Sequence, residues 1–167
     1  MVMRGQILIL ALTPVLGTFV LFYAADLRIN TSASLPVGLY VVSPNGTFIE
    51  FCPADHGLSA QRHYRGRGTC PDGAVPLLKP VIGGPADEVV VSPAGIAVNG
   101  NLLPHTAPLD RDSERRPLTH WPFGRYAAAR GSLWVASSYN PRSYDSRYFG
   151  PVREIAVRDR LRPLIAW

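Results

Sequence analysis

Lys79 is the single lysine among the 17 basic residues of this sequence, and arginine accounts for the others. It lies in an apolar run at residues 74–83, where strand alternation places Val75, Leu77 and Val81 on its face. Arginine cannot lose its proton in a protein, whereas burial disfavours the charged form of lysine and lowers its pKa from about 10.4. Lys79 is therefore a candidate general base, and a lysine that keeps an edge strand soluble is the structural alternative.

Ser34 belongs to a polar turn, Asn-Thr-Ser-Ala-Ser at residues 30–34, that runs through Leu35 and Pro36 into a predicted strand. A serine hydroxyl becomes a good nucleophile only when a positioned base takes its proton, and a neutral lysine can act as that base. Serines that precede a proline can also form an ordinary loop. Ser34 lies nine residues past Ala25, where an apolar segment ends. Even an extended chain would therefore place it within about 30 Å of that end.

A third polar segment, Ser-Tyr-Asp-Ser-Arg-Tyr-Phe-Gly at residues 143–150, places Asp145 two positions before Arg147. This spacing by itself predicts a local ion pair that shapes a loop. The segment gains interest because it follows the serine turn and the lysine strand in the chain.

Three segments, in this order, resemble the motifs of the type I signal peptidases. They read Ser-Ala-Ser-Leu-Pro at residues 32–36, Lys-Pro-Val-Ile-Gly-Gly-Pro-Ala-Asp at 79–87 and Asp-Ser-Arg-Tyr-Phe-Gly at 145–150. The short chain and the pattern Asn-x-Ser-x-Ser-x-Pro-x-Gly-x-Tyr at residues 30–40 resemble most the TraF-type peptidases of conjugative transfer. The chain departs from general signal peptidases at residues 137–140, Ser-Ser-Tyr-Asn, where they carry Gly-Asp-Asn, and those enzymes often hold a larger second β-region.

The resemblance implies a catalytic dyad in which Ser34 is the nucleophile and Lys79 is the general base. It also implies an oxyanion hole that is formed by the backbone N–H of Ser34 and the hydroxyl of Ser32. These donors would stabilise the negative charge of the tetrahedral intermediate. Such chemistry needs no cofactor and no metal ion.

The late motif supplies three further candidate residues by the same resemblance. Ser143 falls where a hydroxyl orients the lysine amine. Asp145 matches an acidic residue that some TraF-type enzymes require, so it is a candidate catalytic residue. Arg147 and Asp145 would brace the loop or contact the substrate.

The resemblance further implies processing of the pilin precursor of a conjugative type IV secretion system, with the precursor, the inner membrane and other transfer proteins as partners. The acyl-enzyme could react with water, which gives hydrolysis, or with the free amine of the pilin, which gives a circular chain. The alternatives are a general signal peptidase and a non-enzymatic inner-membrane assembly protein of a secretion apparatus. The first would cleave many exported precursors, and the second would be indifferent to Ser34 and Lys79.

An uncharged apolar segment spans residues 7–25 and has the length of about 20 residues that a helix needs to cross a bilayer. It predicts a single-pass transmembrane anchor after a short cytoplasmic N-terminus, residues 1–6, with a peptidase domain at residues 29–167 in the periplasm. A cleaved signal peptide is the alternative, although the exit sequence Phe-Tyr-Ala-Ala-Asp-Leu lacks a clean small-x-small pair. Either interpretation takes the domain out of the cytosol.

A content of 16 prolines and 15 glycines disfavours a helical bundle and predicts short strands with frequent turns. Runs rich in β-branched or aromatic residues predict strands at residues 38–42, 74–83, 88–92, 95–99, 132–138 and 153–157. Asn99-Gly100 predicts a tight hairpin turn. The expected fold class is mainly β, a compact signal-peptidase-like fold of one domain that follows one transmembrane helix.

Cys52 and Cys70 are the only cysteines, and in an exported chain they predict a disulfide. A metal site with His56 and His63 is the alternative, but the cysteines lack the paired spacing of zinc ligands. The net charge of +5 could indicate nucleic acid as a partner, yet the basic residues are scattered and the sequence contains no nucleic-acid-binding motif. The charge favours attraction to an anionic membrane surface instead.

Overall fold

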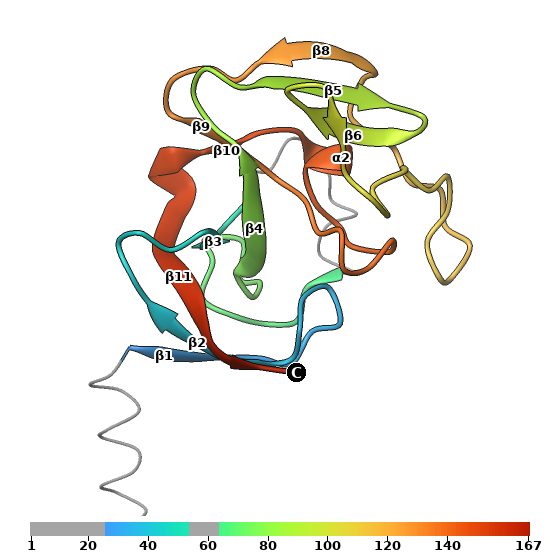
Figure 1. The fold of residues 1–167 in the computed structure, drawn as a ribbon. Coiled ribbons are helices and arrows are strands. Elements are labelled where there is room, and N and C mark those ends of the chain that lie inside the picture. The colour runs from blue at the N-terminus through green and yellow to red at the C-terminus, as the bar shows by residue number, and fades with distance from the viewer. Residues whose placement is uncertain (1–25, 54–63) are drawn as a thin grey trace, which may run out of the picture.

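Strands dominate the computed structural model, which describes residues 26–53 and 64–167 (Figure 1). The larger sheet has the strand order β1 (Leu27–Asn30), β2 (Gly38–Val42), β11 (Val157–Ala166), β3 (Phe48–Phe51), β4 (Leu77–Gly83), β9 (Ser132–Val135) and β10 (Val152–Arg153). The smaller sheet has the strand order β7 (Asn101–Leu102), β6 (Gly95–Val98), β5 (Glu88–Ser92) and β8 (Gly124–Ala127). Two short helices, α2 (Ser146–Phe149) and the 3-10 helix η2 (Glu154–Ala156), lie in the described chain, so the mainly β prediction is confirmed.

β9 links the two sheets because its alternate side chains belong to two separate hydrophobic clusters. Leu133 and Val135 are buried in the cluster that contains Ile49 of β3. Trp134 is buried in the other cluster, which contains Val89 of β5. Both faces of the strand are therefore covered, and this explains why residues 133–135 are apolar in succession rather than alternating.

Most of the predicted strands are present, and the hairpin is where the sequence predicts it. Residues 38–42 and 88–92 match β2 and β5, and β4, β6 and β9 lie inside the other predicted runs. Asn99 and Gly100 connect β6 to β7 with φ angles of 50° and 82°. Positive φ at both central residues is the requirement of the tight turn that Asn-Gly favours.

The prediction of one strand at residues 153–157 is wrong. β10 ends at Arg153, η2 follows, and β11 begins at Val157. β10 pairs with β9 whereas β11 pairs with β2 and β3, so the chain has to change direction between them. Ile155 is 84% exposed at this turn, so its β-branched side chain gains little from the packing that favours such residues in strands.

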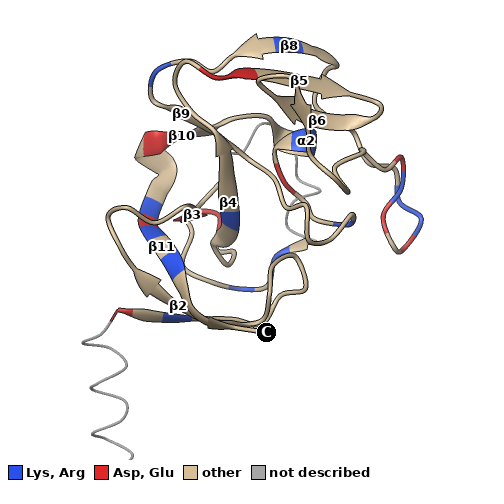
Figure 2. Cartoon of the chain, viewed as in Figure 1, with Lys and Arg blue, Asp and Glu red and all other residues tan. Residues whose placement is uncertain are grey.

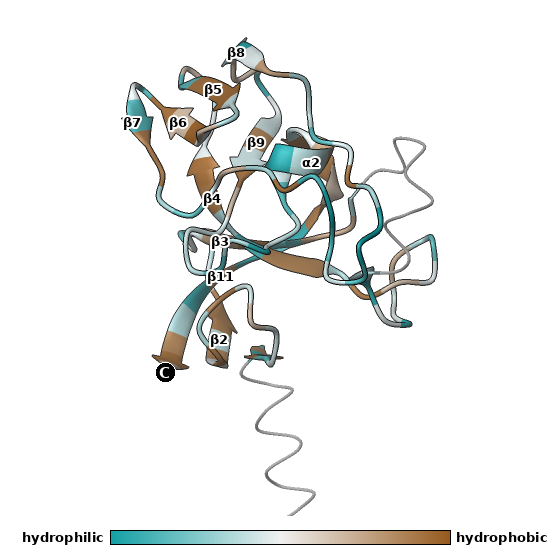
Figure 3. Ribbon diagram, turned by 90° about the vertical axis from the view of Figure 1, so that its right-hand side faces the viewer, coloured by the Kyte–Doolittle hydropathy of each residue, from teal (hydrophilic) through white to brown (hydrophobic). Residues whose placement is uncertain are grey.

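Apolar side chains are exposed on β1 and β11, the two strands that flank β2 at one edge of the larger sheet. Ile29 of β1 and Ile165 of β11 both pair with Leu39 of the strand between them. Leu164 and Trp167 lie on the same end of β11, and these four exposed side chains have 49–72% of their surface accessible. Figure 3 shows the apolar colouring of β2 and of the C-terminal end of β11.

The predicted anchor at residues 7–25 and the N-terminus at residues 1–6 lie outside the described residues. Among the helices of the described segments, none has the length and apolar composition needed to cross a membrane. The transmembrane anchor therefore stays a prediction from the sequence.

A disulfide joins Cys52, directly after β3, to Cys70, as the sequence predicts. Next to it, Arg158 of β11 donates hydrogen bonds to the hydroxyl and the carbonyl of Thr69. The bridge and these bonds hold the segment around Cys70 against the larger sheet. The bonded sulfurs are not free to ligate a metal, and His56 and His63 of the alternative metal site lie outside the described residues.

Replacing Cys52 and Cys70 together by alanine is expected to lower the free energy of unfolding by about 2–4 kcal/mol, because the bridge restricts the unfolded chain over 18 positions. Urea denaturation of the full-length chain in detergent micelles measures the change. Wild-type protein reduced with dithiothreitol is the control and should lose a similar amount. Mass spectrometry of alkylated, unreduced protein isolated from cells should find no free thiol. Two free thiols there would refute the bridge and weaken the argument for export.

Candidate active site

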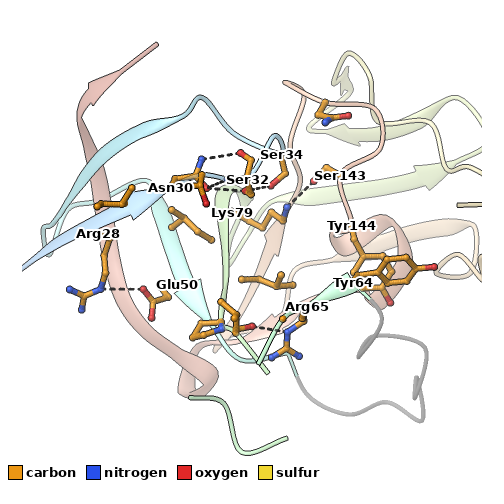
Figure 4. Close-up of a pocket in the computed structure, with 18 of the residues that line it drawn as sticks. Arg28, Asn30, Ser32, Ser34, Glu50, Tyr64, Arg65, Lys79, Ser143 and Tyr144 are labelled. Carbon is orange, nitrogen blue, oxygen red and sulfur yellow. Dashed lines mark hydrogen bonds and ion pairs between the residues drawn. The ribbon is translucent and has the colours of Figure 1, made fainter. Parts of the chain in front are cut away.

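Ser32, Ser34, Lys79 and Ser143 line one cavity of about 520 Å³ (Figure 4). The first two serines lie in the turn that follows β1, the lysine lies in β4, and the third serine lies before α2. Four residues that the sequence places in three distant segments therefore meet at one surface.

Burial defines the environment of Lys79, which is 3% exposed and is the only basic residue of β4, where Figure 2 shows a single blue segment. It pairs with Ile49 of β3, a fully buried residue, so both side chains stand on the same face of the sheet. Its Nζ donates a hydrogen bond of 3.0 Å to Ser143 Oγ. Burial lowers the pKa of Lys79 to about 8, while the Asp145 carboxylate opposes this change and the Arg147 guanidinium adds to it. A large share of the amine is therefore neutral near pH 8.

One edge of β4 near Lys79 has no paired strand among the described residues and faces the cavity. β3 pairs with β4 from Leu77 to Pro80, whereas β9 pairs with it only at Val81 and Gly83. Within the described chain, no strand covers the second edge of residues 77–79, and these residues line the cavity. Such an edge can bind an extended peptide as an added strand.

Asn30 organises the turn that carries Ser32 and Ser34, a role that the sequence analysis missed. Its Nδ2 donates to the carbonyls of Ser32, Leu35 and Pro36 at 3.2, 3.4 and 3.0 Å. Its Oδ1 accepts from the backbone N–H and the hydroxyl of Ser32 at 3.2 and 2.9 Å. The hydroxyl oxygens of Ser32 and Ser34 lie 3.0 Å apart. The available signal was an asparagine at the start of a polar turn, because its side chain readily bonds the backbone two residues on.

Residues 137–140, the segment that departs from general signal peptidases, hold the same turn in place. Ser137 Oγ donates a hydrogen bond to the carbonyl of Ser34, and Asn140 Nδ2 donates to the carbonyl of Ala33 at 3.0 Å. The bonded residues are separated by 103 and 107 positions in the chain. The position of the candidate nucleophile is therefore set by tertiary contacts for which the sequence carried no local signal.

Asp145 and Arg147 form an ion pair in which neither side chain is exposed. Nε and Nη2 of Arg147 donate to the two carboxylate oxygens at 2.8 and 2.9 Å. Asp145 also accepts from the N–H of Ser137 at 3.1 Å, and Arg147 donates to the carbonyls of Ser137 and Pro141 at 3.1 and 3.0 Å. The geometry supports the bracing role, because full burial leaves neither side chain a surface for contact with a substrate.

The candidate nucleophile and base share the cavity without a direct hydrogen bond. Figure 4 shows the Lys79 amine directed toward the part of the cavity where Ser34 and Ser143 lie. In the described chain the amine bonds Ser143 and the Ser34 hydroxyl bonds Ser32, and no hydrogen bond joins Ser34 to Lys79. Catalytic hydrogen bonds often tighten only when a substrate binds, so this arrangement is compatible with proton transfer between the two side chains.

Comparison with known proteins gives matches over most of the chain. The family model for signal peptidase, peptidase S26, matches residues 2–165. A plasmid transfer protein TraF from Escherichia coli is 36% identical over 152 residues, which cover 87% of this chain and 85% of that protein. A conjugal transfer protein TraF from Agrobacterium fabrum is 29% identical over 160 residues, which cover 90% and 89% of the two chains.

A solved structure, that of a signal peptidase I from Enterococcus faecalis, also aligns with this chain. The TM-score is 0.37 and the sequence identity is 21%, over 71% of this chain and 96% of that chain. This likeness is too loose to bear on the fold.

Replacing Lys79 by methionine is expected to stabilise the protein at about pH 7, because it removes the cost of burying an ammonium group. The folded-state pKa of about 8 lies below the unfolded value of about 10.4, so the unfolded state binds more protons between these pH values. The free energy of unfolding of the wild type therefore rises with pH through this window. At about pH 7 it should be about 1–3 kcal/mol lower than that of the variant, and this difference should shrink as the pH rises. Urea unfolding of both proteins at about pH 7, 9 and 10 measures the gap, and a gap independent of pH would contradict the lowered pKa.

Proposed function

This chain belongs to the signal peptidase family, peptidase S26, and from that premise we propose that it is a serine peptidase with Ser34 as nucleophile and Lys79 as general base. A peptidase role of the signal-peptidase type follows from the family. The observation that carries the proposed dyad is the buried amine of Lys79, whose pKa is lowered to about 8, in the same cavity as Ser34. A lysine that served only solubility would be exposed at an edge.

The proposed reaction begins when a substrate carbonyl reaches Ser34 Oγ and the neutral amine of Lys79 accepts the hydroxyl proton. The amine already donates one hydrogen to Ser143 Oγ, which restricts its rotation and leaves its lone pair for the serine proton. When the tetrahedral intermediate collapses, the lysine ammonium gives that proton to the departing amine. The product of this half of the reaction is an ester between the substrate and Ser34.

The backbone N–H of Ser34 and the hydroxyl of Ser32 are the proposed donors to the oxyanion. The Ser32 hydroxyl lies 3.0 Å from Ser34 Oγ, and it now donates to Asn30 Oδ1 at 2.9 Å. Its hydrogen therefore has to turn toward the oxyanion as the negative charge develops. Loss of one such donor typically lowers the turnover rate by about 10²–10³-fold.

The proposed substrate is the pilin precursor of a conjugative type IV secretion system, and other transfer proteins are the proposed partners. Relatives of this chain are named plasmid transfer and conjugal transfer proteins, which supports this choice. The open edge of residues 77–79 would bind the precursor as an extended strand. Water would release a linear product from the ester, and the pilin's own amine would close a circular one. The two products differ by the mass of one water molecule.

We further propose a single-pass protein of the bacterial inner membrane with its catalytic domain in the periplasm. The apolar segment at residues 7–25 directly precedes the domain. The exposed side chains of Ile29, Ile165 and Trp167 lie at the edge of the larger sheet that begins with β1, the first described strand, and an apolar surface there would face lipid. A disulfide persists in an oxidising compartment, so the thiol measurement above also tests the proposed location.

Replacing Ser34 by alanine, Lys79 by alanine or Lys79 by arginine is expected to reduce processing of the pilin precursor by at least about 10³-fold. Arginine keeps the positive charge but cannot accept a proton, so Lys79→Arg separates a base from a structural cation. Gel analysis of the co-expressed precursor measures processing, and Ser113→Ala is a control at an exposed serine. Undiminished processing by Ser34→Ala or Lys79→Ala would refute the dyad. Activity retained by Lys79→Arg would show that Lys79 contributes only its positive charge.

The rate of cleavage is expected to rise with pH through a single ionisation near pH 8, because only the neutral form of Lys79 activates Ser34. A histidine base would instead give an acidic limb near about 6.5. The pH dependence of kcat/KM for the free enzyme measures this limb. An acidic limb at about pH 6.5 would instead point to a histidine base. If that limb disappears when one histidine among His56, His63, His105 and His120 is replaced, that histidine is the base.

A further inference from the structure

Arg142 lies in a turn whose other residues bond to the segment that carries Ser34 and to Lys79. The N–H of Ser143 donates to the carbonyl of Asn140 at 3.0 Å, and the N–H of Arg142 donates to Asn140 Oδ1 at 2.8 Å. The amide of Asn140 also bonds Ala33 beside the nucleophile, and Ser143 accepts from Lys79. The backbone of Arg142 is therefore held at a defined place between the serine turn and the lysine.

Arg142 is also the cation of the cavity that lacks a partner among the described residues. Arg28 lies 3.3 Å from the carboxylate of Glu50, and Arg65 lies 2.8 Å from that of Asp72. The side chain of Arg142 is exposed and makes no ion pair or hydrogen bond within the described chain, although it lines the cavity. Arg142 thus lines the same cavity as Ser34 and Lys79, and its guanidinium is not neutralised within the described chain.

The carboxylate that shares a neighbouring cavity of about 100 Å³ with Arg142 is already engaged. Asp112 accepts hydrogen bonds from the hydroxyl of Tyr64 and from Nε of Arg116, and its second oxygen accepts two backbone N–H groups. Burial alone would raise the pKa of Asp112, but these bonds hold it well below its usual value. Tyr64 and Tyr144 line both cavities together with Arg142.

We propose that Arg142 selects substrates that carry a carboxylate within about two residues of the scissile bond. An extended peptide advances about 3.3–3.6 Å per residue, so a guanidinium on the residue next to Ser143 reaches only the first neighbours of the bond. A planar guanidinium binds a carboxylate through two parallel hydrogen bonds, which an amide of the same shape cannot reproduce. This inference rests on the proposed roles of Ser34 and Lys79, because they define where the scissile bond lies.

Arg142 would act on substrate selection alone, while Lys79 activates the nucleophile. The charged groups that shift the pKa of Lys79 are Asp145 and Arg147. Replacing Arg142 should therefore change the affinity for acidic peptides and leave the acidic limb of the pH profile in place. A merely structural role of Arg142 would not produce this combination.

The test uses alanine-rich decapeptides in which one position at a time holds aspartate, asparagine or lysine. Full-length Ser34→Ala protein in detergent micelles binds each fluorescent peptide, and anisotropy gives the dissociation constants. At one or two adjacent positions, aspartate should tighten binding about 10-fold relative to asparagine. Arg142→Gln should abolish this difference, and Arg142→Glu should shift the preference to lysine. Arg130→Gln, at an exposed arginine outside the cavity, is the matched control and should keep the preference.

Equal affinity of the Ser34→Ala protein for the aspartate and asparagine peptides, including undetectable binding of both, would overturn the proposal. An aspartate preference that survives in Arg142→Gln would overturn it as well. Cleavage by the wild type, followed by mass spectrometry, keeps the two proposals distinguishable. Cleavage without a charge preference would contradict only the role of Arg142, whereas an Arg142-dependent preference in binding without any cleavage would contradict only the proposed dyad.

Discussion

The geometry of the site depends most on the buried ion pair between Asp145 and Arg147. Beyond the pair itself, the guanidinium donates to backbone carbonyls of four residues, Ser137, Pro141, His105 and Ala107. Loss of one partner from a buried pair leaves an uncompensated charge and costs about 3–5 kcal/mol. The pair therefore holds residues 137–143 in one conformation, and this segment in turn bonds both the serine turn and the lysine.

The same pair makes a buried lysine compatible with a role as a base. A lone carboxylate near Lys79 would keep the amine protonated, and a lone guanidinium would make its charged form still less favourable. Asp145 and Arg147 act in opposite directions on the pKa of Lys79, so burial remains the largest influence. The pair of Asp145 and Arg147 thus stabilises the loop, while burial of the amine sets the pKa of Lys79.

Short-range patterns predicted β5 and β9, whose side chains are covered, but they missed β11 and also β3, although Ile49 and Phe51 of β3 are fully buried. β9 and β5 are apolar because their faces are buried, so their composition is visible along the sequence. β11 carries Arg158, Asp159, Arg160 and Arg162, yet it lies between β2 and β3 and pairs with both. The predicted strand at residues 153–157 was wrong for the converse reason, because strand-like residues occupy an exposed turn.

The sequence by itself determined which residues could carry the chemistry, because a single lysine in an apolar strand and a serine in a polar turn are visible as residue types. It also determined the hairpin and the cysteine pair. Only the tertiary structure decided that Ser34, Lys79 and Ser143 share one cavity and that Asn30, Ser137 and Asn140 hold the serine turn. The physical reason is that a hydrogen bond between residues more than 100 positions apart depends on how strands pair and pack, and no local periodicity of the sequence records that arrangement.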